Sequence, residues 1–300
     1  MLKFIKRNFP IILFIIIFIT GFSIMLYPFV SNMISAKTYD SVIVSYTKTA
    51  SNTSDSKNIQ LLAQAKSYNS SLSTTTVMDA FSYPDREESA DYLNTLNINN
   101  NGVMGFISIP KIDVRIPIYH GTSSKVLQKG VGHLEGSSLP IGGSGTHSIL
   151  SAHRGLPSAR LFTDLDQMKK GDQFYIYVLD QTLAYEVDQI TVIEPDNTDY
   201  LTMNNNEDYV TLVTCTPYAV NTHRLLVRGH RVEYKEEVLS TTVVSKKSTT
   251  ADIVFYIGIA IAIITFIVAI IIIIFINKKD NKNTGNNISS NTANLINKNV

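Results

Sequence analysis

The stretch "YVTLVTCTPYAVNTHRLLVRGHRVEY", residues 209–234, contains two apolar, β-branched runs joined by a short turn. "YVTLVT" (209–214) and "RLLVRGHRVEY" (224–234) have the length and residue content typical of strands. The connection "TPYAVNTH" holds a proline, which does not continue a paired strand. The pattern predicts a hairpin, and a hairpin of this length would place Arg224 beside the end of the strand that carries Cys215.

More short strands are predicted upstream. "IDVRIPI" (112–118) alternates apolar residues with polar residues or proline, which is the period of two expected of a strand. "THSILSA" (146–152) is a further strand, and "FYIYVLDQTLAYEVDQITVIEP" (174–195) is predicted to be a hairpin that turns near Asp180–Gln181. Short, frequent strands separated by Gly/Pro turns favour an all-β sandwich or closed barrel of roughly 130 residues.

Helical segments are predicted beside these strands. Residues 36–72 are polar and free of glycine, and a helix is expected to begin with Ser54 or Asp55 as its N-cap. "LPSARLFTDLDQMKKGD" (156–172) has leucine and methionine at helical spacing before a glycine, which predicts one helical insert. Residues 76–88 are expected to be irregular.

An uncharged apolar run occupies residues 11–30 and follows Lys3, Lys6 and Arg7. As a helix it would span ~30 Å, the thickness of the hydrocarbon core of a membrane. A cleaved signal peptide is the alternative, with "ISA" at 34–36 as the cleavage site. The run exceeds the ~7–15 residues of a signal-peptide core, which favours a retained anchor.

A second uncharged run, residues 253–276, precedes Lys278, Lys279 and Lys282. Its length predicts another membrane span. Basic residues outside both spans place both termini in the cytoplasm and the middle of the chain, about 36–250, outside it. The expected parts are a stub and anchor (1–35), a helical segment (36–100), a barrel (101–235), a linker (236–252), the second span and a disordered tail (277–300).

The charge balance excludes one class of partner. The chain of 300 residues has 26 basic and 25 acidic residues and a net charge of +1, so nothing favours nucleic-acid binding. The sequence contains neither a phosphate-binding G-x-x-x-x-G-K motif nor H-E-x-x-H, and its single cysteine excludes a thiolate metal cluster. No cofactor or metal is expected.

Cys215 is that single cysteine. An exported domain with one cysteine has no internal disulfide to form, and a free external thiol is open to oxidation. Cys215 is therefore either a small buried apolar residue or a nucleophile. The cysteine count leaves both alternatives open.

A nucleophilic thiol needs a general acid/base and a group that stabilises an oxyanion. His153 follows the strand at 146–152 just as Cys215 ends its own strand, so adjacent strands would bring the two side chains to one rim. His223 is the rival candidate because it precedes Arg224. The Arg224 guanidinium offers forked donors to a carbonyl or an oxyanion, or it forms a surface salt bridge.

The other histidines are assigned no catalytic part. His147 lies inside its predicted strand, so its side chain is expected to point along the sheet. His120 and His133 follow glycine-flanked turns and are expected at the surface.

The combination of "SAHRG", "TLVTC" and Arg224 resembles the sortases, cysteine transpeptidases of Gram-positive bacteria. "HRGLPSARLFTDLDQMKKGD" and "TLVTCTPYAVNTHRLLVRGHR" are most similar to class C, the sortases that polymerise pilins. The resemblance covers about residues 30–280. It implies an eight-stranded β-barrel at the surface of a Gram-positive cell membrane.

The resemblance also implies roles for the site residues. Cys215 would be the nucleophile, His153 the general acid/base and Arg224 the stabiliser of the substrate carbonyl and its oxyanion. The substrate would be an LPXTG-type sorting signal, cleaved between Thr and Gly through a thioacyl-enzyme. An amine, for class C a lysine of the next pilin subunit, would resolve that intermediate.

Class C sortases often carry a lid with an Asp-Pro-aromatic tripeptide in the active site. Here the lid is expected at residues 76–88, where Asp79-Ala80-Phe81 matches except that alanine replaces proline. Asp79 would pair with Arg224 or His153, and the Phe81 ring would cover the thiol. Tyr83-Pro84-Asp85 is an alternative anchor, and an ordinary linker is the simplest alternative.

Three other functions remain open at this point. A sortase that anchors surface proteins to the cell wall would share the site and differ in its amine acceptor, a cell-wall precursor. A hydrolytic protease would use water in place of the amine. A non-catalytic barrel tethered to the membrane would be a binding module and would not require Cys215.

Overall fold

The computed structural model describes residues 2–72, 78–82, 87–202 and 206–235, together with 256, 258–260, 262–267 and 270–271. The chain divides into two compact units. One comprises Met1–Leu26 with Lys246–Val300, and the other comprises Tyr27–Ser245. The predicted linker at 236–252 and the predicted tail at 277–300 lie outside the described residues.

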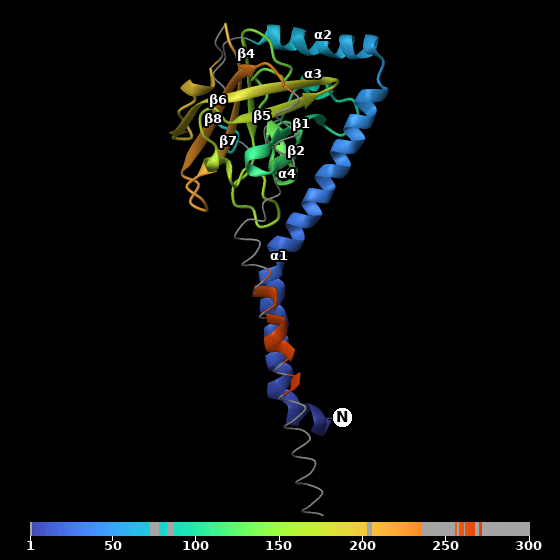
Figure 1. Cartoon of the computed structure of the whole chain (residues 1–300), viewed down its shortest axis with the longest axis vertical. Coiled ribbons are helices and arrows are strands. Elements are labelled where there is room, and N and C mark those ends of the chain that lie inside the picture. Colours follow the sequence, from blue (N-terminus) through green and yellow to red (C-terminus); the bar gives the residue numbers. More distant parts are fainter. Residues whose placement is uncertain are drawn as a thin grey trace, which may run out of the picture. The chain divides into compact units, whose positions relative to one another are not determined.

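Eight strands close into one barrel in the order β1-β2-β3-β4-β7-β8-β6-β5 (Figure 1). This confirms the barrel and decides against the open sandwich. Their bounds are β1 Val103–Ile109, β2 Val114–His120, β3 Val131–His133, β4 Thr146–Ser151, β5 Gln173–Val178, β6 Gln181–Ile193, β7 Asp208–Thr216 and β8 His223–Val232. The predicted hairpin near Asp180 is confirmed as the β5–β6 pair, whereas β1 and β3 were not predicted.

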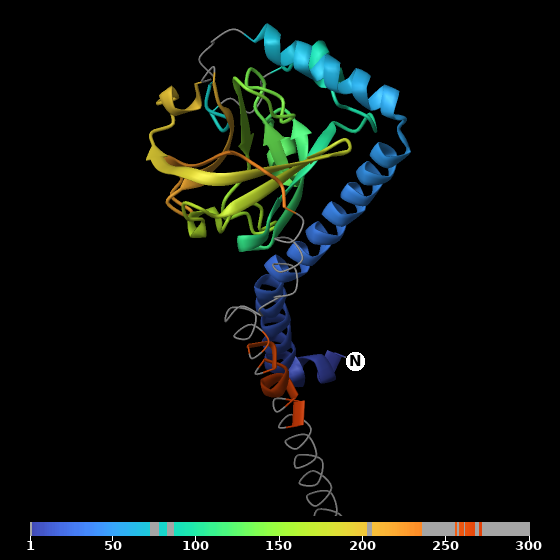
Figure 2. The ribbon, with the colours of Figure 1, turned by 45° about the horizontal axis from the view of Figure 1, so that its top comes forward.

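The helices are α1 Leu2–Asn52, α2 Asp55–Ser71, α3 Ala90–Asn94 and α4 Ser124–Lys129, with short 3-10 turns at Pro110–Ile112, Leu165–Gln167 and Asp199–Leu201. Figure 2 shows α2 lying across the outside of the barrel. The predicted helical character of 36–72 is confirmed. Ser54 is the N-cap of α2 by backbone position, although its side chain makes no capping bond.

Within the described residues, α1 is the helix that is long and apolar enough to cross a membrane. Of the predicted second span, 253–276, the structure describes only scattered helical residues. The two-span topology therefore stays a prediction.

The predicted helix at 156–172 is wrong. The segment forms turns and a single short 3-10 helix, Leu165–Gln167, and Leu161 has a φ of 39°, which interrupts any α-helix. Its polar groups bond to the preceding loop instead: the Phe162 N–H donates to the His153 carbonyl, and the Thr163 hydroxyl accepts from the Gly155 N–H. These tertiary bonds replace the i to i−4 bonds that an isolated helix would make.

The expectation that His120 and His133 lie at the surface is also wrong, because both are buried. His133 Nδ1 lies 2.9 Å from the Tyr92 hydroxyl, and its Nε2 lies 2.8 Å from the Ser138 carbonyl. Burial lowers the pKa of His133 to about 3. The ring is neutral and structural, and it joins α3 to β3.

Tyr46 fastens α1 to the barrel. Its hydroxyl donates to the Met104 carbonyl at 2.9 Å and accepts from the Leu179 N–H at 2.9 Å. Both bonds are buried, and Ile43 and Ala50 are buried on the same helix. This contact holds α1 against β1 and the β5–β6 turn.

Replacing Tyr46 by phenylalanine keeps the packing of the ring and leaves a buried N–H and a buried carbonyl without their partner. We expect the free energy of unfolding of the full chain in detergent to fall by about 1–3 kcal/mol in denaturant titrations. Tyr200→Phe, at an exposed tyrosine, is the matched control. Equal stability of the two variants would contradict the structural role of the Tyr46 hydroxyl.

Candidate active site

Cys215 and Arg224 face each other across a strand pair. Cys215 lies near the end of β7, Arg224 lies near the start of β8, and the two are Cα partners in the antiparallel register. Both side chains are buried. The structure therefore confirms the predicted hairpin and the predicted position of Arg224 beside Cys215.

His153 reaches the same rim because β4 runs parallel to β7, with Ser151 opposite Val213. Parallel neighbours end at one edge of a sheet. A cleft of about 270 Å³ is lined by His153, Cys215 and Arg224, together with Ala80 and Phe81. Of the five predicted site residues, four line this cleft, and the fifth, Asp79, directly precedes Ala80, which lines it too.

Three bonds join the two segments that carry the thiol and the imidazole. The Thr214 hydroxyl donates to the Ala152 carbonyl at 2.7 Å, and the Ala152 N–H donates to the Val213 carbonyl at 3.1 Å. Arg154 donates from Nη1 to the Thr216 hydroxyl at 3.1 Å. These bonds lie on both sides of Cys215 and His153, so they limit how far the two can separate.

Sequence reasoning missed Arg154 and Thr214. Arg154 also donates from Nε to the Thr163 carbonyl at 3.1 Å and forms an ion pair with Asp166. The only sequence signal was its place beside His153 in "SAHRG". Partners that lie far away in the sequence cannot be read from that neighbourhood.

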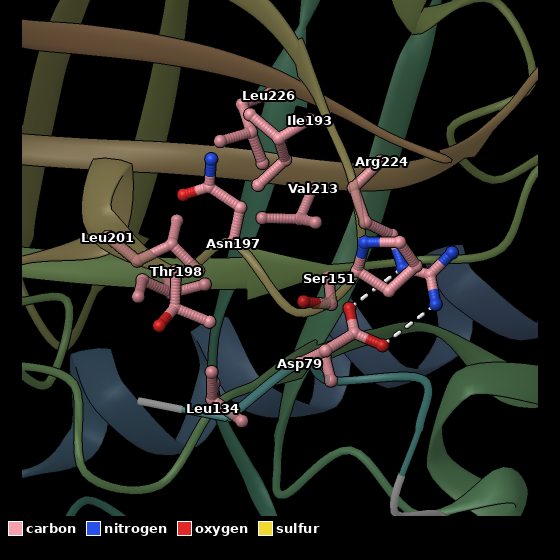
Figure 3. A pocket seen from close by; sticks show the side chains of 13 residues that line it. Asp79, Leu134, Ser151, Ile193, Asn197, Thr198, Leu201, Val213, Arg224 and Leu226 are labelled. Carbon is pink, nitrogen blue, oxygen red and sulfur yellow. Dashed lines mark hydrogen bonds and ion pairs between the residues drawn. The ribbon is translucent and has the colours of Figure 1, made fainter. Parts of the chain in front are cut away.

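Asp79 pairs with Arg224 through both of its carboxylate oxygens (Figure 3). Arg224 Nε donates to Asp79 Oδ1 at 2.7 Å, and Nη2 donates to Oδ2 at 2.8 Å. Both side chains are less than one-tenth exposed. A buried, bidentate pair of this kind is among the strong ion pairs that proteins form.

The Phe81 ring lies close to both His153 and Arg224. Its ring centroid is 5.6 Å from that of His153 and 5.1 Å from the Arg224 guanidinium carbon. Ala80, between the two, is buried in an apolar cluster with Ile149, Val213 and other barrel residues. The alternative anchor, Tyr83-Pro84-Asp85, lies outside the described residues.

The surroundings of Cys215 and His153 favour the neutral forms of both side chains. Burial raises the pKa of the Cys215 thiol, Arg224 acts in the opposite direction, and Asp79 raises it again. Burial lowers the pKa of His153. With Asp79 in place, the thiol and the neutral imidazole are the favoured forms.

The remaining histidines do not line this cleft. His147 is buried, with Nδ1 2.8 Å from the Thr202 carbonyl and Nε2 2.7 Å from the Thr211 hydroxyl. His223 lies one position before Arg224, and its Nδ1 is 2.9 Å from the Thr222 hydroxyl. In the part of the chain that the structure describes, no cluster of His, Cys, Asp or Glu is arranged to hold a metal ion.

Comparison with known proteins places this geometry in a family. Residues 107–232 match the Sortase domain. The crystal structure of sortase C-1 from Streptococcus pneumoniae is 45% identical, and the match covers 65% of this chain and 100% of that one, with a TM-score of 0.62. The chain belongs to the sortase family.

Other class C structures match this sortase similarly. Sortase C1 from Streptococcus agalactiae is 49% identical, with 65% of this chain and 99% of that chain covered and a TM-score of 0.59. A structure described as the pilus-related sortase C of Group B Streptococcus is 47% identical, with coverage of 63% and 95% and a TM-score of 0.59.

Curated relatives carry the same family name. Sortase D of Bacillus subtilis is 30% identical over 131 residues, which are 43% of this chain. Sortase A of Bacillus anthracis is 27% identical over 151 residues, or 50% of this chain and 70% of the relative. The chain spans 63% of the length of the Bacillus subtilis protein.

The charge of Asp79 can be removed to test its effect on the thiol. We expect Asp79→Asn to shift the midpoint of the pH profile of Cys215 alkylation to lower pH, because a carboxylate beside the thiol disfavours the thiolate. Loss of burial as the segment loosens acts in the same direction. The measurement is the alkylation rate of the full chain at a series of pH values.

Asp91→Asn, an exposed change on α3, is the control for that experiment and should leave the midpoint in place. An unchanged or raised midpoint for Asp79→Asn would contradict the proposed electrostatic coupling.

Proposed function

We propose that this sortase is a membrane-anchored, extracytoplasmic transpeptidase that links pilin subunits. It would cleave an LPXTG-type sorting signal between Thr and Gly and join the Thr carbonyl carbon to a pilin lysine. The observation that carries the proposal is the single cleft in which a thiol, an imidazole and a guanidinium meet. The pilus-related description of one class C relative supports the choice of pilin as acceptor.

The first half of the reaction follows from the positions of these groups. His153, neutral at rest, takes the proton of the Cys215 thiol, and the thiolate attacks the Thr carbonyl carbon. Arg224 donates to the oxygen that becomes negative. The imidazolium then protonates the departing glycine amine, and a thioester to Cys215 remains.

The second half repeats these steps with the new amine. His153 accepts a proton from the lysine amine as it attacks the thioester carbon, and the thiolate leaves. Thiolate is a good leaving group, so an amine displaces it readily. The product is an isopeptide bond, and the imidazolium returns its proton to the thiolate, which restores the starting state.

The segment Asp79–Phe81 would act as a lid. Asp79 already holds the Nε and Nη2 donors of Arg224, so those donors are free for a substrate oxyanion only after Asp79 leaves. When the lid leaves, water reaches the carboxylate of Asp79 and the guanidinium of Arg224. Opening therefore does not leave an unpaired charge buried in the protein. Binding of the sorting signal would therefore compete with closure.

The apolar part of α1 would serve as the anchor. No residue in its most apolar 18-residue window is buried, which suits contact with lipid rather than with a protein core. The predicted six-part organisation and the second span belong to this same proposal.

The direct test is incubation of the full chain with an LPXTG-type peptide, with and without an amine, followed by intact mass. We expect a thioacyl adduct without amine and a ligated peptide with it. Cys215→Ala should form neither, while His153→Ala and Arg224→Ala should lose most activity. Arg224→Lys should also fail substantially because an ammonium lacks the fork.

His223→Ala is the matched control and should retain most activity. Residual ligation by Cys215→Ala comparable to wild type would contradict the mechanism and favour a binding module. If His223→Ala is more damaging than His153→Ala, the assigned base is wrong. A preference for a cell-wall amine over a pilin lysine would indicate surface-protein anchoring, and release by water alone would indicate a protease.

Arg154 is expected to act as a positioning residue. Arg154→Ala removes its bond to Thr216, so kcat should fall by about tenfold or more, since small misplacements of reacting groups are costly. KM should change little because Arg154 does not line the cleft. Arg154→Lys should recover only part of kcat.

Arg160→Ala is the control for Arg154, because Arg160 lies on the same loop and pairs with an aspartate at the surface. An Arg154→Ala enzyme with unchanged kcat would contradict the positioning role.

The lid is tested by removing both anchors, Asp79→Ala with Phe81→Ala. If each contact stabilises closure by ~1–2 kcal/mol, the open fraction at rest is on the order of a per cent or less. The double variant should then alkylate Cys215 at least about tenfold faster at one pH. Met78→Ala, an exposed neighbour, is the control and should be alkylated at the wild-type rate. If the double variant is also alkylated at the wild-type rate, the segment is only a linker.

A further inference from the structure

The loop that follows His153 is bound to α1 by two hydroxyl groups. Ser31 Oγ donates to the Ser158 carbonyl at 3.0 Å, and Ser35 Oγ donates to the same carbonyl at 2.9 Å. Ser31 and Ser35 lie four residues apart and therefore on one face of the helix. Ser158 is thus fixed at a known height along α1.

That height can be compared with the thickness of a bilayer. No charged residue lies between Arg7 and Lys37. A helix that enters the hydrocarbon core near Pro10 leaves it near Phe29, after ~30 Å at 1.5 Å per residue. The headgroup layer adds roughly 5–8 Å beyond the core, which corresponds to the turn that holds Ser31 and Ser35.

The side chains of this turn fit such a position. Val30, Met33 and Ile34 are 51%, 61% and 60% exposed, although each is apolar. The next turn is polar, with Lys37, Thr38 and Asp40. A bilayer whose surface lies between these turns would cover the exposed apolar side chains and leave the charged ones in water.

The β7–β8 loop extends the same surface. Its residues 217–222 carry no charge, yet Tyr218 is 56% and Val220 is 63% exposed. The Tyr218 ring adjoins Gly155, where an added Cβ would lie 2.9 Å from it. We call residues 155–159 and 217–222 together the lower rim; Asn221 of this rim lines the cleft, and 155–159 carry no charge either.

We propose that the lower rim rests in the headgroup layer of the bilayer in which α1 is anchored. The occupant is the lipid surface itself, since the rim is tied by hydrogen bonds to the apolar segment of α1. Exposed tyrosine is typical of this layer. The inference rests on the proposed anchoring, and it places the loops that follow His153 and Cys215 at the membrane surface.

The structure also supplies a control site at another height. The β5–β6 turn is bound to Tyr46 through the Leu179 N–H, and Tyr46 lies about 16 Å further along α1 than Ser35 at 1.5 Å per residue. Asp180 in this turn is exposed. A label at Asp180 should therefore stay in water while a label on the lower rim does not.

The test uses spin labels on the full chain in nanodiscs of phosphatidylcholine and phosphatidylglycerol. Cys215→Ala removes the native thiol, and single cysteines are introduced by Pro157→Cys, Val220→Cys, Asp180→Cys and Ile17→Cys. Power saturation then measures access to oxygen, which concentrates in lipid, and to a water-soluble nickel chelate. Thermal melts check that each labelled chain is folded.

We expect the labels at positions 157 and 220 to show several-fold less access to the chelate, relative to oxygen, than the label at 180. If both rim labels, or either of them, match the label at 180 while the label at 17 is in lipid, the inference is overturned and the anchoring stands. If the label at 17 is itself open to the chelate, the anchoring proposal fails and this inference fails with it.

Discussion

The parallel pairing of β4 with β7 is the constraint on which the site depends. Parallel neighbours end at one edge, so the residues that follow them, His153 and Cys215, share a rim although they are far apart in the sequence. The antiparallel return of β8 adds Arg224 directly opposite the thiol. Any change of register in either pair would move one of these side chains to another level or to the other face of the sheet.

The same rim also holds the ion pair between Asp79 and Arg224. A buried guanidinium without an anionic partner is costly. Asp79 supplies that partner and also disfavours the thiolate of Cys215. One carboxylate thus pairs with the guanidinium and disfavours ionisation of the thiol.

The loop after His153 connects the chemistry to the rest of the molecule. Arg154 binds it to the strand that carries Cys215, and the Ser158 carbonyl binds it to α1. The loop is irregular because these distant partners, rather than its own neighbours, satisfy its polar groups. In a helix at 156–172 the Ser158 carbonyl would instead accept from the N–H four residues further on.

Local pattern was enough to predict much of the barrel. Alternating and β-branched runs predicted β2 and the strands from β4 to β8 in outline, and the hairpin at 209–234 was enough to place Arg224 beside Cys215. The apolar run at 11–30 was likewise evident as a helix of membrane length, because hydropathy and length are properties of consecutive residues.

Tertiary structure alone decided the rest. Burial of His120 and His133, the bond between Arg154 and Thr216, and the contact between Asp79 and Arg224 all join residues from separate segments. Their energies depend on desolvation and on distance, and neither quantity exists until the barrel closes. The sequence by itself determined which groups were present and which strands carried them, and only the closed barrel decided which of them meet.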